Sequence, residues 1–564
     1  MDVLGISAFH QDSAAVLLRD GRPLAAAQEE RFSHIRSDSN FPRRAVRYVL
    51  READLASARE VDWVVFYEKP LRKFERLLVC QLQAFPRSAK IFSRGMFQWL
   101  GDRLWTKNLL CNELGIEPEQ VLFSSHHQSH AASACYASGF DRAACLVADG
   151  SGEWTTTSLA AFENGQLEML LENAFPHSLG LFYAAFTQFL GFEADLDGNK
   201  IEELAAYGKP TFRDSMNDLI QREDGALFKI DQGPFRFSFD PEHFWRPELE
   251  ECFGPARKPA GPLAYQEGDS RHADLAASLL QVVGDTLLHL LAELYRKVSV
   301  PKLCLAGELA ALPALNARLL RESPFEEIFI APAMGDAGGA FGAASLVAQA
   351  KGDPASFALM DLALGEHLLP DPGAEAKELA DADAVRQALL SGLNQGPVAW
   401  LRDRFEWGPR CLGKRSLLAD PRNAKGKESI NQGLKHREDF RPFACAVPSE
   451  KAGDYFELPS GADRALRWKQ IAVPVKELGR EKAPAAVHVD GTAVPQLVDR
   501  EADPELHALL TAFGEQSGVP ILLQSSLDLR GDPMARGEAE ARAFMERSQL
   551  RHLVVENRLY TQPD

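Results

Sequence analysis

Two histidines and an aspartate in one short stretch are the side chains whose types and spacing best suit chemistry. His126 and His130 are four residues apart, and the small residues after them favour one continuing helix, so both imidazoles would share a face. The apolar run 143–148 predicts a short buried strand that ends in Asp149 at a tight turn, Gly150 to Gly152. A carboxylate at the carboxyl end of a strand is well placed to face a cation and phosphates. The alternative is a pair of surface histidines and a turn-forming aspartate.

A second acidic strand end follows the apolar run 328–331. This strand leads into Asp336, the first residue of a glycine-rich helix that can approach a ligand closely and present its N-terminus to anions. A cleft between two similar α/β halves would bring Asp149 and Asp336 together. With the two histidines they would form a two-His, two-Asp set, which suits a divalent transition metal such as iron, zinc or manganese.

The elements that must position these residues are predicted as a mixed α/β order. A strand over 2–8, a polar turn from His10 to Ser13 and two strands joined at Asp20-Gly21 resemble the way actin-like ATPases hold phosphates. Residues 70–114 are helical and locally basic, which indicates either a solvated face or an electropositive wall of a substrate channel. The stretch 212–269 has no clear period and is predicted as an insertion or lid.

Composition limits the class of protein. A chain of 564 residues is expected to form at least two domains, and 45% hydrophobic with 25% charged residues is typical of a soluble globular protein. The formal charge of −18 argues against duplex nucleic acid as the main partner. Eight cysteines without a close pair fit a reducing compartment. The sequence shows no leader pattern, and no apolar run approaches a length of about 18 residues. We therefore expect a cytoplasmic protein without a membrane partner.

The last third of the chain is rich in arginine and lysine. Residues 352–385, with several prolines, look like a linker before this second domain. Arginine forks suit the oxygens of phosphate or carboxylate groups, so the cluster predicts an anion site, with an ordinary ion-pair network as the alternative. A predicted buried strand delivers Gln524, Ser525 and Ser526 to a turn beside it. The cations are Arg402, Arg404, Arg410, Lys414, Arg415, Arg422, Lys435, Arg437 and Arg441.

These motifs together resemble the O-carbamoyltransferase family that includes NodU, TobZ and the cephalosporin carbamoyltransferase. The resemblance runs through HQDSAA, EERF, HHQSHAASA, LVADGSGE and MGDAGGAFGAA to EWGPRCLGKRSLLADPR, KHREDFRPFA and HVDGTA. It implies an actin-like domain over 1–355, similar to the enzyme that makes threonylcarbamoyladenosine in tRNA, a linker over 356–385 and a YrdC-like α/β domain over 386–564.

The resemblance also implies a reaction. Family members use ATP and carbamoyl phosphate to make carbamoyladenylate in the YrdC-like domain, and a hydroxyl of a natural-product acceptor attacks this intermediate in the actin-like domain. His126, His130, Asp149 and Asp336 match the family's iron ligands, and Mg²⁺ is a further candidate cation. Arg410, Arg415, Lys435, Arg437 and Arg441, with Ser525 and Ser526, match the carbamoyl phosphate and ATP site.

Further roles are expected from the same likeness. Lys200 and Arg36 are expected to contact the carbamoyladenylate, and His10 or Asp12 to position or deprotonate the acceptor hydroxyl. A nucleotide in the cleft is expected to meet the glycine turns and the next helix, at Gly150, Gly152, Gly307, Asn316 and Gly335. The partner is expected to be a small molecule, and a homodimer is expected from the likeness alone.

Several positions depart from the family pattern and keep two alternatives open. They are Gln11, Arg36, Ser37, Glu202, Glu203, Glu308, Val494, Gln524 and Asp528. Glu308 replaces a close-approach glycine, where its charge should repel an α-phosphate. One alternative is a homologue that has lost activity and serves as a partner protein. The other is transfer to an amine or of a different acyl group, with Glu202, Glu203 and Glu308 as acid–base groups.

Overall fold

The computed structural model describes residues 1–194, 196–225, 227–258, 270–354, 356–368, 371 and 375–562. These residues form two compact units. Unit 1 comprises 1–29, 38–258 and 270–359, and unit 2 comprises 30–37 and the described residues from 360 onward. The predicted domain boundary at 355 lies outside the described residues, and most of the predicted linker belongs to unit 2.

Unit 1 begins with a five-stranded sheet in the order β3-β2-β1-β4-β5. The first three strands are antiparallel, as the predicted hairpin requires, and β4 and β5 continue the sheet parallel to β1. The strands β1, β2 and β4 are almost wholly buried, because their side chains are apolar on both faces. The bounds are β1 Asp2–Ser7, β2 Ala14–Arg19, β3 Arg22–Gln28, β4 Trp63–Phe66 and β5 Val121–Phe123.

A second five-stranded sheet repeats this order along the chain. Its order is β12-β11-β6-β7-β8, so that the first, second and third strands are antiparallel and the fourth and fifth run parallel to the first. The prediction of two similar α/β halves, and with it the actin-like fold class, is confirmed. The bounds are β6 Arg142–Ala148, β7 Thr155–Glu163, β8 Gln166–Ala174, β11 Lys302–Ala306 and β12 Glu327–Ile330.

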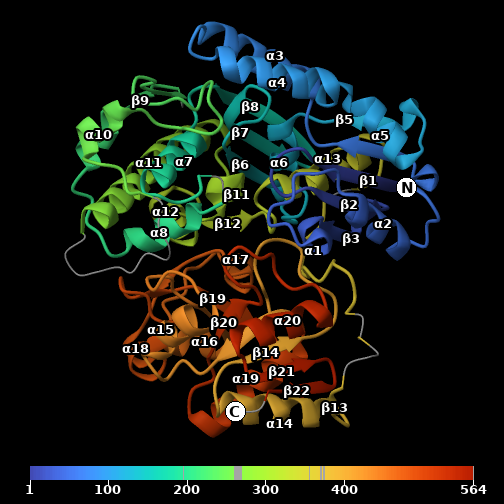
Figure 1. Cartoon of the computed structure of the whole chain (residues 1–564), viewed down its shortest axis with the longest axis vertical. Coiled ribbons are helices and arrows are strands. Elements are labelled where there is room, and N and C mark those ends of the chain that lie inside the picture. The colour runs from blue at the N-terminus through green and yellow to red at the C-terminus, as the bar shows by residue number, and fades with distance from the viewer. Residues whose placement is uncertain are drawn as a thin grey trace. The chain divides into compact units, whose positions relative to one another are not determined.

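Two equivalent helices lie between the halves. Helix α6 (His126–Cys135) follows β5 and packs against β6, β7 and β11, whereas α13 (Asp336–Ala350) follows β12 and packs against β1, β2 and β4 (Figure 1). The two helices also pack against each other so closely that a Cβ on Gly342 would lie 1.8 Å from the Ser129 carbonyl oxygen. The run of small residues in both helices is therefore needed for this contact.

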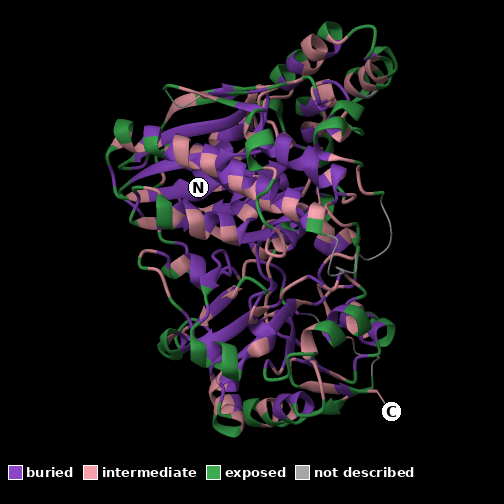
Figure 2. Ribbon diagram, turned by 90° about the vertical axis from the view of Figure 1, so that its left-hand side faces the viewer, coloured by how far each residue is buried: buried purple, intermediate pink, exposed green. Residues whose placement is uncertain are grey.

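The remaining helices of unit 1 pack around this core, which Figure 2 shows as largely buried. The predicted basic helical stretch is confirmed. The bounds are α2 Arg43–Glu52, α3 Pro70–Gln83, α4 Ala89–Gly101, α5 Thr106–Leu114, α7 Leu179–Phe189, α8 Gly198–Ala205, α11 Ser270–Val298 and α12 Pro313–Glu322. Among the described residues, α11 alone is long and apolar enough to cross a membrane, and 61% of its most apolar window is buried inside the protein, as in a core helix.

The stretch 212–258 contains more regular structure than its sequence predicts. It forms α9 (Arg213–Asn217), β9 (Ile220–Glu223), β10 (Leu227–Ile230) and α10 (Pro247–Phe253). The sequence shows no clear period here because the phenylalanines are widely spaced, yet they are buried by tertiary contacts. An insertion or lid stays a prediction. The rest of that prediction, 259–269, lies outside the described residues.

Unit 2 is built on an eight-stranded mixed sheet with the order β13-β22-β21-β14-β15-β20-β16-β19. Leu390, Trp400, Leu418, Leu510 and Val554 belong to its apolar core. The strands are β13 Lys377–Glu378, β14 Val398–Leu401, β15 Arg415–Ala419, β16 Ala444–Pro448, β19 Pro495–Val498, β20 Leu522–Ser526, β21 His552–Val555 and β22 Arg558–Thr561. The helices are α1 Glu30–Ser33, α14 Ala382–Leu393, α15 Gly426–Glu428, α16 Ser449–Tyr455, α17 Asp463–Arg467, α18 Glu477–Lys482, α19 Pro504–Ser517 and α20 Glu538–Ser548.

Candidate functional site

Four side chains converge at the centre of unit 1. His126 and His130 come from the first turns of α6, Asp149 follows β6, and Asp336 begins α13. All four are buried, and one ligand atom from each lies within 4.8 Å of the others. The Nε2 atoms of His126 and His130 are 3.1 Å apart, and His126 Nε2 lies 3.0 Å from Asp149 Oδ2. Asp336 Oδ1 lies 3.5 Å from both Nε2 atoms.

This geometry fits a metal ion. Metal bonds of about 2.0–2.2 Å separate neighbouring ligand atoms by roughly 3.0–3.5 Å in tetrahedral or octahedral sites. The observed separations run from 3.0 Å to the 3.8 Å between His130 Nε2 and Asp149 Oδ2. Two imidazoles and two carboxylates accept several divalent transition metals, so the set does not select one of them. The structure thus brings together the four residues that the sequence singled out.

The electrostatics of the four residues are mutually dependent. Burial disfavours the charged forms of His126, Asp149 and Asp336, but the groups that face them outweigh it. Hydrogen bonding to Asp149 and the charge of Asp336 raise the pKa of His126 well above its ordinary value. Burial alone would raise the pKa of Asp336. Hydrogen bonding to His10 and the charge of His126 outweigh it and hold this pKa well below its ordinary value. A bound cation would take the place of these protons between the carboxylates and imidazoles.

The polar loop after β1 reaches the same centre. His10 Nδ1 lies 3.0 Å from Asp336 Oδ2, and the imidazole is 43% exposed, so a small molecule could reach its other nitrogen. The carboxylate of Asp12 faces the start of α13, because a Cβ on Gly335 would lie 3.9 Å from Asp12 Oδ2. Both predicted loop residues therefore lie beside the four-residue centre.

An outer layer around His126 is not evident from the sequence. Glu68 Oε2 lies 3.6 Å from His126 Nδ1 and 2.6 Å from Lys73 Nζ, and all three side chains are buried. The Glu153 carboxylate accepts hydrogen bonds from the backbone N–H groups of His126 and Lys69. The one available signal is that Glu68 comes shortly after the buried strand β4, as Asp149 comes directly after β6 in the other sheet.

Part of the predicted basic stretch points inward. Lys73 pairs with Glu68, and the buried Arg76 guanidinium lies over the Phe175 ring, 4.6 Å from its centroid. Arg103 donates a hydrogen bond of 2.6 Å to the carbonyl of Phe9 in the loop after β1. The interpretation of this stretch as a solvated face is therefore wrong for these three cations. They pack on the elements that carry the centre.

Two of the departing glutamates take different places. Glu202 Oε1 accepts hydrogen bonds from the N–H groups of Ala314 and Leu315, so it caps the first turn of α12. Glu308 lies at the centre itself, because a Cβ on Gly150 would lie 3.5 Å from Glu308 Oε2, and its N–H donates to Asp149 Oδ1. The carboxylate of Glu308 thus occupies the edge of the glycine turn where a nucleotide phosphate was expected.

The other residues predicted to meet a nucleotide are partly engaged in the fold. Lys200 is buried on α8 and pairs with Asp197 at 3.0 Å. Asn316 is fully buried and donates to the Ala310 carbonyl. Gly307 has a φ of 89°, and a Cβ there would lie 2.4 Å from the Ala148 carbonyl oxygen, so this position requires glycine. Arg36 belongs to the segment 30–37, which is part of unit 2.

The arginine-rich loop of unit 2 is held by its own residues. Arg415 is fully buried, and its guanidinium donates to the carbonyls of Arg536, Arg402, Lys414 and Asp403. Burial lowers the pKa of Arg415 to about 10. The structure therefore gives Arg415 a structural role, and four of its five N–H groups are used for it.

A buried glutamate holds the same loop from its other side. Glu406 Oε1 accepts hydrogen bonds from the backbone N–H groups of Leu412, Lys414 and Arg415, at 2.7, 2.8 and 3.3 Å. Converging N–H groups of this kind form an anion-binding concavity, and here the protein fills it with its own carboxylate. Sequence reasoning missed Glu406, because a glutamate inside a basic motif looks like an ordinary ion-pair partner.

Other predicted anion-binding residues meet in the neighbouring part of unit 2. Lys435 Nζ donates to the Ser526 carbonyl at 2.6 Å and pairs with Asp528, while Ser526 Oγ donates to Asp528 Oδ1. The charge of Lys435 is thus already neutralised by a carboxylate. Arg437 donates to Asn431 Oδ1, and Arg441 lies 4.0 Å from the buried Glu438. Arg410 is half-buried in the arginine-rich loop.

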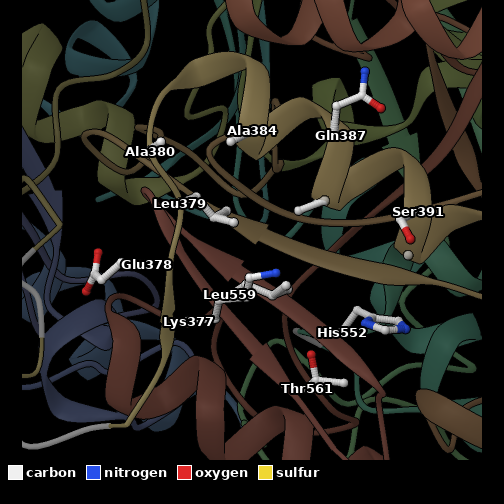
Figure 3. Close-up of a pocket in the computed structure, with 12 residues that line it drawn as sticks. Lys377, Glu378, Leu379, Ala380, Ala384, Gln387, Ser391, His552, Leu559 and Thr561 are labelled. Carbon is white, nitrogen blue, oxygen red and sulfur yellow. The ribbon is translucent and has the colours of Figure 1, made fainter.

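A hollow of about 470 Å³ lies elsewhere on unit 2, between α14, β13 and the strands β21 and β22 (Figure 3). Leu379, Gln387, Ser391, His552, Leu559 and Thr561 are among the residues that line it. Its described lining has Lys377, Glu378 and His552 as ionisable groups and no arginine. This composition does not suit a phosphate, so the hollow is separate from the anion cluster.

Two family models match almost the whole chain. The model described as the carbamoyltransferase N-terminus matches residues 2–345, and the model described as the carbamoyltransferase C-terminus matches residues 391–562. The chain belongs to the carbamoyltransferase family. The resemblance predicted from the sequence is thereby confirmed, and this carbamoyltransferase is a transferase enzyme.

Curated relatives agree with the assignment. An uncharacterized protein of Synechocystis, sll1178, is 37% identical over 98% of this chain and 96% of its own. The nodulation protein NolNO of Sinorhizobium fredii is 34% identical over 97% of this carbamoyltransferase and 78% of its own length. The 3'-hydroxymethylcephem-O-carbamoyltransferase of Streptomyces clavuligerus is 30% identical over 64% of this chain and 69% of its own.

Solved structures resemble this carbamoyltransferase only weakly. Component A of (R)-2-hydroxyglutaryl-CoA dehydratase from Acidaminococcus fermentans has a TM-score of 0.34 and 15% identity, over 62% of this chain and 98% of that one. The assignment of the fold therefore rests on the repeated strand order of unit 1.

Proposed function

We propose that this carbamoyltransferase uses ATP and carbamoyl phosphate to form carbamoyladenylate and then transfers the carbamoyl group to a hydroxyl of a small natural-product acceptor. The supporting observation is the buried set of His126, His130, Asp149 and Asp336, in a fold whose sheets repeat the actin-like order. The named relatives that carbamoylate a cephem hydroxymethyl group support an oxygen acceptor. We place the reaction in the cytoplasm.

The four residues would hold a divalent metal, and Fe(II) is our choice among the ions that suit this donor set. The metal would act as a Lewis acid that stabilises charge developing on phosphate oxygens. The protein's own part is to hold two imidazoles and two carboxylates in a buried, preorganised array. Glycine at position 307 allows the chain to pass close to the Ala148 carbonyl behind Asp149.

His10 is our first choice to position or deprotonate the acceptor hydroxyl. Its Nδ1 lies within hydrogen-bond distance of Asp336, so in the tautomer that donates from Nδ1 the Nε2 atom would accept a proton, and its exposure allows a substrate to approach. Asp12 flanks the same opening. In unit 2 the basic motif, with Arg410, Arg437 and Arg441, would hold carbamoyl phosphate and ATP during adenylation.

The function is tested by measuring pyrophosphate release from ATP with and without carbamoyl phosphate and Fe(II). Release that depends on carbamoyl phosphate, with carbamoyladenylate or AMP detected by mass spectrometry, is the expected result. His10→Ala should keep this release and lose transfer to any acceptor. Absence of release by metal-loaded, folded protein would refute the proposal.

A second candidate function rests on Glu308. Its carboxylate lies beside Gly150, where it would repel a nucleotide phosphate, so the chain could be a homologue without adenylate transfer that serves as a partner protein. Glu308→Gly separates the two functions. If nucleotide binding and transfer appear only in Glu308→Gly, the partner function is supported. If wild type and variant are equally active, it is excluded.

A further inference from the structure

Lys469 in unit 2 is a buried cation for which the fold provides no carboxylate. Its side chain is 3% exposed, and its ammonium donates to Cys411 Sγ at 3.2 Å. Among the described residues, no aspartate or glutamate forms an ion pair with it. Burying an ammonium without a paired charge is costly, so such groups usually have a counter-ion or a ligand.

The position of Lys469 is also fixed by an unusual backbone. The residue lies in the turn after α17 and has a φ of 57°, in the left-handed region that favours glycine, asparagine and aspartate. The neighbouring Gln470 N–H donates to the Ala465 carbonyl at 2.9 Å, which holds the turn. Lys469 thus combines a sparsely populated backbone conformation with a buried side chain.

Its surroundings are those of the predicted anion cluster. Cys411 belongs to the arginine-rich loop. In the sequence it lies between Arg410 and Leu412, the first of the residues whose backbone N–H groups donate to Glu406. Cys411 also lies close enough to Lys435 to influence the pKa of that ammonium, which burial lowers. Lys435, however, is paired with Asp528. Lys469 is thus the better placed of the two lysines to bind an added anion.

We propose that Lys469 binds a phosphoryl group beside Cys411, as an additional anion-binding residue of unit 2. The ligand class is a small phosphate compound, carbamoyl phosphate in the function proposed above, on which this identity of the ligand rests. An ammonium binds a phosphate as a point charge, and the buried setting strengthens that interaction relative to water. The thiol of Cys411 keeps the ammonium oriented when no ligand is bound.

The test uses the full-length protein and two probes, inorganic phosphate and carbamoyl phosphate. Binding is measured by calorimetry at constant ionic strength for wild type, Lys469→Met and Lys451→Met, the last being an exposed lysine on α16. Wild type and Lys451→Met should bind both probes equally. Lys469→Met should bind them at least about tenfold more weakly, as loss of a charge-assisted hydrogen bond predicts. Unchanged binding by Lys469→Met would overturn the proposal.

Two further measurements separate charge from structure. The melting temperature of Lys469→Met without an anion should equal or exceed that of wild type, because an unpaired buried charge has been removed. Lys469→Arg keeps the charge and should bind phosphate within about fivefold of wild type. Equal losses of affinity in the arginine and methionine variants would show that the shape of the side chain matters rather than its charge, and would refute the inference.

The outcomes also distinguish this inference from the function on which it rests. A wild-type protein that binds phosphate through Lys469 but releases no pyrophosphate would keep the anion site and refute the proposed reaction. An active wild type whose KM for carbamoyl phosphate is unchanged by Lys469→Met would keep the reaction and refute the role of Lys469.

Discussion

Glu68 and Lys73 show how the environment of His126, one of the four residues proposed to hold a metal, is set by residues outside that set. The Glu68 carboxylate faces His126 Nδ1, the ring nitrogen that does not point at the other three ligands. Burial opposes its charge, but Lys73 and His126 outweigh it and lower the pKa of Glu68 to about 2. A permanently charged acceptor behind an imidazole keeps the opposite nitrogen available for a metal.

We predict that Glu68→Gln weakens metal binding about 10- to 100-fold, because outer partners of histidine ligands have effects of this size. The measurement is metal retention in competition with a chelator. Glu75→Gln, an exposed glutamate on α3, is the matched control and should bind metal like wild type. The double variant Glu68→Gln, Lys73→Met removes the stranded ammonium, so equal metal affinity in that variant and wild type would contradict the role of Glu68.

The four residues of the centre could be singled out from the sequence because their signals are local. A four-residue histidine spacing and an acidic residue after an apolar strand each occur within one element. Glu68, Glu406 and Lys469 could not, because their partners lie 58, 6 and 58 positions away and the contact depends on folding. Arg415 is a further case, since the sequence does not show that four of its N–H groups donate to backbone carbonyls, and its role in the anion site stays a prediction.

At the scale of the elements, Glu202 connects α8 to the start of α12. We predict that Glu202→Gln keeps both the melting temperature and activity, because an amide oxygen can still accept from the N–H groups of Ala314 and Leu315. Glu202→Ala should lose about 1 kcal/mol, the usual effect of a lost helix cap. Thermal unfolding and a carbamoyl-transfer assay check both variants. A strong loss of activity in Glu202→Gln alone would favour an acid–base role.

Asp285 joins three elements of unit 1 and gives a pH-dependent prediction. It lies on α11 and pairs with Arg318 of α12 and Arg213 of α9, and Arg222 of β9 adds a further positive charge nearby. Burial opposes ionisation, but the two paired arginines outweigh it and lower the pKa of Asp285. The resulting stabilisation is complete above the ordinary carboxyl pKa of about 3.9 and is lost as the pH falls through the lowered pKa.

Asp285→Asn should therefore lower the urea midpoint at pH 7, by an amount equivalent to about 1 kcal/mol for this partly exposed pair. The difference from wild type should stay constant from pH 8 to pH 5 and shrink below about pH 4. The measurement is urea unfolding followed by fluorescence across this range. A difference that grows on acidification would show that the sign of the linkage is wrong.

The strands and helices of unit 1 could largely be predicted from the sequence, whereas the way they pack together could not. The hairpin at Asp20-Gly21 and the strand ending at Asp149 follow from turn residues and apolar runs. The repeated strand order and the crossing of α6 and α13 between the halves depend on contacts between residues distant in sequence. The segment 30–37 is the clearest case. It lies in the sequence between β3 and α2 of unit 1, and this position does not reveal that it belongs to unit 2.

At the scale of the whole molecule, the two units are proposed to perform separate half-reactions. We predict that His130→Ala loses carbamoyl transfer and metal binding but still releases pyrophosphate from ATP and carbamoyl phosphate. The reason is that His130 belongs to unit 1 and the anion cluster to unit 2. Transfer assays and pyrophosphate release on the same preparation check this. Loss of both activities in a folded variant would place adenylation in unit 1.

The repeated sheets of unit 1 have a further consequence for its origin. His126 and Asp336 are the first residues of equivalent helices, and His10 and Asp149 follow the equivalent first strands. The contact of His10 with Asp336 therefore mirrors the contact of Asp149 with His126, with imidazole and carboxylate exchanged. Two identical halves would carry the same residue at equivalent positions, whereas here one half has a histidine where the other has an aspartate. The two halves have therefore diverged into unequal contributors to one centre.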